Sequence, residues 1–213
     1  MSAYGIQRHS HSSRSPRFLN RFHLNTPPLE IPPMMGVEMT ENTGHDCSVF
    51  PNQTLFEPHF YSCDSEGKQP VFLLHDLALS NQTGDYVYPL DFSQPLRVFL
   101  DLTSSANRRL DNIRAEVTLY RRSVGWLGCG WFYIPTLGLL DNYDICGEDN
   151  LSCPIYTGRQ VVEVVLRPNV LFLALMKLIH SDRVPYQVII KLINNRSSSE
   201  ELLCAAFQAR INF

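Results

Sequence analysis

Apolar and polar residues alternate along much of the chain after residue 70, and a period of two residues is typical of a half-buried β-strand. The clearest case is 95–103, in which every second residue is apolar: Leu96, Val98, Leu100 and Leu102. The segment 113–120 repeats the pattern. Further strands are predicted at 71–80, 130–134, 160–166, 186–194 and 202–211. About seven short strands separated by turn residues predict an all-β sandwich or barrel.

Two segments, 71–80 and 170–179, have patterns of their own. In 71–80 we expect one buried face made of Val71, Leu73, Leu77 and Leu79. Residues 170–179 read VLFLALMKLI, which is apolar nearly all round and lies between Pro168 and Pro185. A buried strand, a short buried helix and an exposed apolar interaction surface all fit this composition.

Residues 1–45 differ from the rest of the chain. They contain five prolines, and the first 29 residues are basic and free of acidic side chains. This composition predicts a disordered tail or a mispredicted leader, with one domain over 46–213. We find no apolar stretch that resembles a signal-peptide core, and no run long enough to span a membrane.

The cysteines indicate in which cellular compartment the protein folds. All six lie after residue 46, and an even number is typical of a disulfide framework in a secreted protein. Four Asn-x-Ser/Thr sequences support the same route, and they predict glycosylation at Asn52, Asn81, Asn150 and Asn195. The alternative is a reduced cytosolic protein. A net charge of −3 without a basic face argues against nucleic acid as a partner.

Signals of catalysis are weak. The glycine-rich segment 125–131 lacks the Lys-Ser/Thr of a phosphate loop, so Cys129 is expected to be structural. Trp126, Trp131, Phe132 and Tyr133 are expected in the core or a cavity wall. The acidic residues between 141 and 149 are more typical of a solvated loop than of a metal site, and the histidines have no metal-ligand spacing. We therefore predict no enzyme, no cofactor and no metal.

Two groups of cysteines resemble one family. Cys63 precedes the first clear strand and Cys204 lies in the last one, and Cys146 and Cys153 enclose a hairpin that ends in Cys-Pro-Ile and is followed by Gly158 and a strand. With the final ELLCAAFQARI segment, this resembles the ML lipid-recognition domain, over about 59–213. The resemblance implies an immunoglobulin-like β-sandwich of two antiparallel sheets that enclose an apolar cavity. It also implies the pairs Cys63–Cys204 and Cys146–Cys153, which leaves Cys47 and Cys129 as the third.

The resemblance further implies a function without catalysis, namely lipid binding and transfer, in a secreted or lysosomal setting. The cavity is expected to be lined by apolar residues of the alternating strands: Leu96, Val98, Leu100, Ile113, Val117, Leu119, Val188, Ile190 and Phe207. The cavity mouth or membrane contact is expected in 170–179, at Leu171, Phe172, Leu173, Leu175, Met176, Lys177 and Ile179. On this expectation, Phe172→Asp with Leu175→Asp abolishes liposome binding and leaves the fold intact.

The expected partners are a lipid with acyl chains (a glycolipid or a phospholipid, with sterol second), a transient membrane surface and, third, a lipid-processing enzyme to which the lipid is presented. The main alternative is an adhesion or protein-interaction domain with an immunoglobulin-like sandwich whose core is filled. The same apolar positions serve both readings, because a dry core and a cavity wall need the same residue types.

Overall fold

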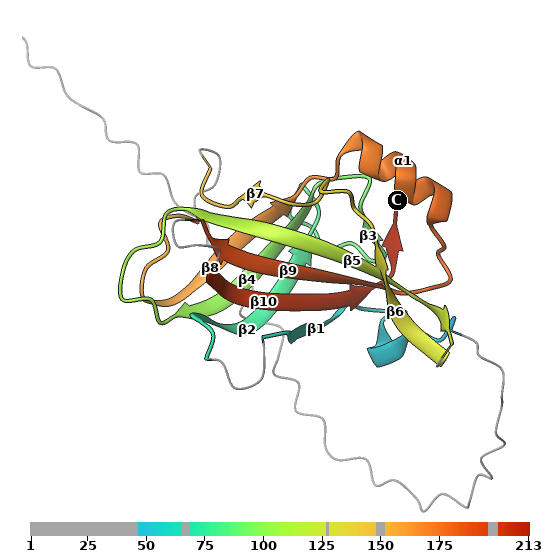
Figure 1. Ribbon diagram of the computed structural model, residues 1–213, viewed down its shortest axis with the longest axis horizontal. Coiled ribbons are helices and arrows are strands. Elements are labelled where there is room, and N and C mark those ends of the chain that lie inside the picture. Colours follow the sequence, from blue (N-terminus) through green and yellow to red (C-terminus); the bar gives the residue numbers. More distant parts are fainter. Residues whose placement is uncertain (1–46, 65–68, 127, 148–151, 196–199) are drawn as a thin grey trace, which may run out of the picture. The chain divides into compact units, whose positions relative to one another are not determined.

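Two antiparallel sheets form the domain in the computed structural model, which describes residues 47–64, 69–126, 128–147, 152–195 and 200–213 (Figure 1). The predicted tail 1–45 lies outside the described residues. The larger sheet runs in the order β1 (His59–Ser62), β10 (Glu200–Ala209), β9 (Tyr186–Asn194), β5 (Ile113–Gly125) and β6 (Gly128–Ile134), and β7 (Tyr143–Asp144) also pairs with β5. The smaller sheet has the order β2 (Phe72–Ser80), β4 (Leu96–Ser104) and β8 (Gly158–Leu166).

Three short elements complete the fold. β3 (Leu90–Asp91) and β11 (Ile211–Asn212) form a parallel pair, and η1 (Pro51–Gln53) is a single turn of 3-10 helix before β1. The segment predicted as one strand at 202–211 is divided here, because β10 ends at Ala209 and the chain then pairs with β3 as β11.

The alternation in the sequence produces the sandwich. In β4 every second residue from Leu96 to Ser104 is buried, and β5 has the same pattern from Ile113 to Leu119. Because successive side chains of a strand point to opposite faces, each strand turns one apolar row toward the other sheet. The prediction of an all-β sandwich of two antiparallel sheets is confirmed.

The predicted face of β2 is partly wrong. Leu77 and Leu79 are buried as expected, but Leu73 is 54 % exposed and Phe72 is fully buried in its place. The pairing of β2 with β4 shifts between Leu74 and Asp76, which marks a β-bulge. An extra residue in one strand reverses the alternation, so the inward positions before the bulge differ by one from those after it.

The segment 170–179 is a helix, α1 (Val170–Ile179), which connects β8 to β9. The side chain of Asn169 caps its first turn by accepting a hydrogen bond from the Leu171 backbone N–H at 2.8 Å. Lys177 in the last turn complements the negative end of the helix dipole. Of the two secondary structures that the sequence left open, the segment forms the helix and not the strand.

The strands define two ends of the sandwich. α1 lies in the connection between Leu166, where β8 ends, and Tyr186, where β9 begins, and it is at the same end as β3 and the C-terminus (Figure 1). We call this the helix end. At the other end, the loop end, β4 finishes at Ser104 and β8, in register with it, begins at Gly158.

Candidate functional site

The interior between the two sheets contains all nine residues that were predicted to line a cavity. β4 contributes three of them, β5 three, β9 two and β10 one, and none is more than 3 % exposed. They belong to one continuous cluster of buried apolar side chains. The two facing sheets therefore present apolar side chains to each other, and these side chains pack together.

α1 has two different faces at the helix end. Phe172 and Met176 are fully buried and point into the hydrophobic cluster, whereas Leu173, Leu175 and Ile179 are half-buried. The opposite face carries Val170, Leu171, Ala174, Lys177 and Leu178, all of which are exposed. Four of these five side chains are apolar, so α1 presents an apolar stripe to solvent.

This arrangement changes which residues of α1 are available to contact a membrane or to border a cavity mouth. Leu171 and Lys177 are exposed, as a contact surface needs, but Phe172 and Met176 anchor α1 to the core. The expected effect of Phe172→Asp is corrected accordingly, since a carboxylate at this buried position would disrupt the fold. Val170 and Leu178, which are 79 % and 85 % exposed, were missed. A helical period applied to 170–179 would have found them, because positions 170, 171, 174, 177 and 178 share one face.

An aromatic cluster packs against the buried face and the C-terminal end of α1. The Phe213 ring packs edge-on against Phe172, His180 and Tyr186, with centroids 5.2–6.1 Å apart. His180 Nδ1 lies 2.9 Å from the Tyr186 hydroxyl, which also accepts a hydrogen bond from the Ser181 backbone N–H at 3.1 Å. Arg121 Nη1 donates to the Ile179 carbonyl at 2.8 Å and ties the end of the helix to β5. These contacts fix the helix against the end of the sandwich.

Burial shifts the two titratable rings of this cluster in opposite directions. It lowers the pKa of His180, which Asp182 opposes only weakly at 4.0 Å, and it raises the pKa of Tyr186. Both shifts favour the neutral form, because removal of water penalises the charged one. The His180 imidazole and the Tyr186 phenol are therefore mostly neutral near pH 7.

The hairpin between β5 and β6 was also misjudged from the sequence. Trp126 was expected in the core or a cavity wall, but it stands at the hairpin tip and is 98 % exposed. Phe132 and Tyr133 of β6 are exposed as well, and only Trp131 is partly covered, with Arg122 over its ring at 5.9 Å. β6 is an edge strand, so its side chains lack a neighbouring strand on one side.

A pocket of about 360 Å³ opens at the loop end. Its wall includes Val71 and Ser105 from the smaller sheet's connections and Glu200 and Leu202 from β10 of the larger sheet. Ala106, Asn107, Arg108 and Leu110, from the connection between β4 and β5, complete it. The pocket thus touches both sheets, but at the end opposite to the predicted mouth.

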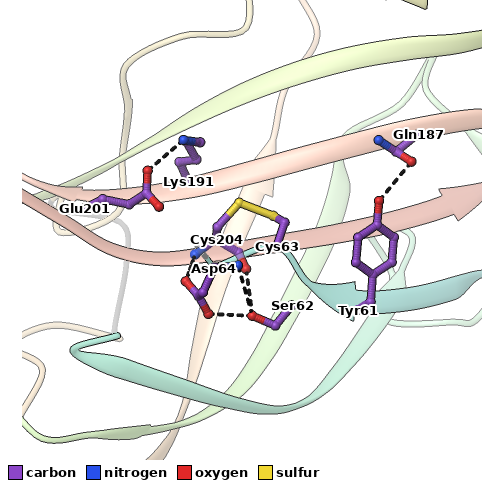
Figure 2. The surroundings of a disulfide bond; sticks show 8 residues. All are labelled: Tyr61, Ser62, Cys63, Asp64, Gln187, Lys191, Glu201 and Cys204. Carbon is purple, nitrogen blue, oxygen red and sulfur yellow. Dashed lines mark hydrogen bonds and ion pairs between the residues drawn. A yellow bond between two sulfur atoms is a disulfide. The ribbon is translucent and has the colours of Figure 1, made fainter. Parts of the chain in front are cut away.

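All six cysteines are paired. The bonds are Cys47–Cys129, Cys63–Cys204 and Cys146–Cys153, with Cα atoms 4.9–5.4 Å apart. Figure 2 shows the second bond, which ties the end of β1 to β10. Beside it, Asp64 accepts a hydrogen bond from the Cys204 backbone N–H at 2.8 Å. Two of these pairs are those that the resemblance implied, and Cys47–Cys129 is the pair that then remained.

The predicted glycosylation sites differ in access. Asn52 and Asn195 are exposed, Asn81 is half-buried, and Asn150 lies outside the described residues. The Asn52 side chain donates to Gln208 at 3.0 Å, and the side-chain Oδ1 of Asn81 accepts hydrogen bonds from the Thr83 hydroxyl and the Asp85 backbone N–H. Glycosylation at these positions stays a prediction.

Within 47–64, 69–126, 128–147, 152–195 and 200–213, no three His, Cys, Asp or Glu side chains are grouped as a metal ion would require. None of the helices in these ranges has both the length and the apolar character of a membrane span.

No known family model matches the chain, and no curated protein sequence matches it. Solved structures with a similar fold include a Niemann-Pick type C2 protein from Japanese carpenter ant, at 16 % identity and a TM-score of 0.44, covering 72 % of this chain and 99 % of that one. They also include the C-terminal domain of wzt, at 9 % identity and a TM-score of 0.38, covering 74 % of this chain and 79 % of that one.

Proposed function

We propose that the domain binds a lipid between its two sheets and transfers or presents it, without catalysis. The observation that carries the proposal is the pair of facing apolar sheet surfaces, to which every predicted lining residue contributes a buried side chain. Entry of an acyl chain gains about 0.8 kcal/mol for each methylene removed from water, so one or two long chains suffice for tight binding. A lipid with acyl chains is the expected ligand, with a sterol second.

The apolar stripe of α1 supports a role at a membrane surface. Surface leucine and valine side chains grouped on one helix face mark an interaction site more often than scattered ones do. Lys177 lies within the stripe, and Arg167 and Arg183 are exposed on either side of α1. Cations beside an apolar face suit a bilayer that contains anionic lipids. In this proposal the exposed face of α1 contacts the bilayer while its buried face covers the end of the sandwich.

The disulfides support a secreted or lysosomal setting. Three bonds persist only where the environment is oxidising or where they are shielded from cytosolic thiols. In such a setting the protein would take lipid from a membrane and present it to a second membrane or to a lipid-processing enzyme.

Leu178→Asp, and more strongly Leu171→Asp with Leu178→Asp, should weaken vesicle binding and slow lipid transfer. Burying an exposed leucine is worth about 1.5–3 kcal/mol, so loss of both side chains should reduce vesicle affinity by at least about a hundredfold. The measurement is cosedimentation with phosphatidylcholine vesicles containing phosphatidylserine, together with transfer of a fluorescent phospholipid from donor to acceptor vesicles.

Leu73→Asp is the matched control for this experiment. Leu73 is also an exposed leucine, but it lies on β2 near the loop end. It should retain wild-type binding and transfer. If Leu73→Asp and Leu178→Asp weaken binding equally, α1 is not the contact surface; if the wild type transfers no lipid at all, the proposed function is wrong.

A further inference from the structure

We infer that the loop-end pocket binds the zwitterionic head of a single-chain phospholipid, with Arg108 against the phosphate and Glu200 against the ammonium group. This inference rests on the proposed function and adds to it a headgroup site at the end opposite to α1. Three features of the pocket carry it: the pairing of its charges, the apolar part of its wall and its size.

The charges of the pocket form a separated pair. Arg108 Nη2 and Glu200 Oε2 are 3.9 Å apart, at the outer limit of an ion pair, and the two side chains are 62 % and 45 % exposed. A guanidinium offers several donors in a planar fork that matches phosphate oxygens. A carboxylate accepts the hydrogen bonds of a primary ammonium group. A ligand that carries both charges therefore complements both residues, whereas an anion alone would also meet the Glu200 carboxylate.

The polar neighbours hold this pair in place. Glu200 Oε2 accepts a hydrogen bond from Asn194 Nδ2 at 3.2 Å, which fixes the carboxylate at the start of β10. Ser105 is held at the opposite wall, because both its backbone N–H and its hydroxyl donate to the Val71 carbonyl, at 2.9 and 3.0 Å. The rim is therefore built on backbone that the two sheets position.

The inner part of the wall is apolar. Leu110 and Leu202 are 5 % and 1 % exposed and belong to the same buried cluster as the inner faces of the sheets. Val71 and Ala106 are partly buried and pack against this cluster. A ligand with a polar head and a hydrocarbon chain can place its head at Arg108 and Glu200 and its first methylenes on these side chains.

The size of the pocket limits the ligand. A volume of about 360 Å³ is near the lower end of the range for small-molecule sites. It suits a headgroup and the beginning of one chain better than the head and both chains of a diacyl lipid. This is why the inference names a single-chain phospholipid.

Three ligands with the same acyl chain test the inference: lysophosphatidylethanolamine, lysophosphatidic acid and monoacylglycerol. Binding to the full chain is measured by calorimetry below the critical micelle concentration. Arg108→Gln should weaken both phosphate-containing ligands about tenfold, the scale of one lost charge-assisted hydrogen bond. Glu200→Gln should weaken lysophosphatidylethanolamine by a similar factor and should not weaken lysophosphatidic acid. Neither change should affect monoacylglycerol.

Arg109→Gln is the matched control, because Arg109 is the next residue, is also 62 % exposed and also pairs with a carboxylate, that of Asp111 at 3.2 Å, but does not line this pocket. It should bind all three ligands like the wild type, and thermal unfolding should show all variants folded. Equal effects of Arg108→Gln and Arg109→Gln, or equal loss of monoacylglycerol binding, would overturn the headgroup site while leaving lipid binding intact. A wild type that binds none of the three ligands would overturn the headgroup site, while the vesicle-transfer experiment tests the proposed function separately.

Discussion

Phe172→Asp should destabilise the domain by about 4 kcal/mol or more, even though the neighbouring exposed face of α1 tolerates charge. Phe172 is fully buried, packs on Phe213 at 6.1 Å and belongs to the hydrophobic cluster. Loss of a buried phenylalanine costs about 3–5 kcal/mol, and the carboxylate must also be desolvated or protonated. Since domains unfold at a cost of about 5–15 kcal/mol, this change removes much of the stability.

Leu178→Asp on the same helix is the control for this result. Its side chain is 85 % exposed, so the free energy of unfolding should stay within about 0.5 kcal/mol of the wild type. Chemical denaturation of both variants, followed by circular dichroism, makes the comparison. If Phe172→Asp were as stable as Leu178→Asp, α1 would not pack on the sandwich in the way described, and the assignment of its two faces would be wrong.

Replacing Cys63 and Cys204 together by alanine should produce the largest loss among the three disulfides. The bond spans 141 positions and ties β1, an edge strand, to β10 (Figure 2). In the chain-entropy model a loop of this length contributes about 5 kcal/mol by restricting the unfolded chain. Ser62, Asp64 and Tyr61 still hold β1 by hydrogen bonds to β10 and β9, but these are individually worth about 1 kcal/mol.

The matched control is Cys146→Ala with Cys153→Ala. This bond spans only 7 positions, so the same model gives about 2 kcal/mol. The free energies of unfolding of the two double variants, measured without reductant, should therefore differ by about 3 kcal/mol. A larger loss from the short loop would contradict this account and would indicate that strain or local packing dominates.

The strands could be predicted from the sequence where one face of the strand is buried and the other is exposed to solvent. β4 and β5 met this condition over most of their lengths. In β4, Val98 is buried, while its neighbour Arg97 faces outward and pairs with Glu163. In β5, Val117 is buried, while its neighbour Glu116 faces outward and pairs with Arg114. Hydrophobic burial and solvation then impose opposite requirements on successive residues, and the sequence records both. The short strands β1, β3, β7 and β11 have too few residues to show a period.

Other features depend on contacts that no local pattern contains. The bulge in β2 reverses which residues are buried, so Leu73 and Phe72 exchange the faces that alternation assigns to them. Trp126 is exposed because it stands at the tip of the hairpin between β5 and β6. The two faces of α1 were hidden because both are apolar, and only tertiary packing separates Phe172 from Leu178.

Whether the interior between the sheets is filled by side chains or holds a lipid cannot be predicted from the pattern of residues. The apolar rows of β4, β5, β9 and β10 have the same composition whether they contact one another or an acyl chain. The loop-end pocket was equally hidden, because Arg108 and Glu200 lie 92 positions apart and meet only through the arrangement of the two sheets. A charged pair of this kind is a property of the tertiary structure.

Native mass spectrometry of the protein secreted from eukaryotic cells and purified without detergent tests the central claim most directly. A lipid held between the sheets predicts a population heavier than the polypeptide and its glycans by the mass of one lipid, released on denaturation and identifiable in the extract. The polypeptide and glycan mass alone, unchanged after incubation with phospholipid, glycolipid or sterol, would contradict lipid binding and favour a filled sandwich that acts in adhesion or protein interaction.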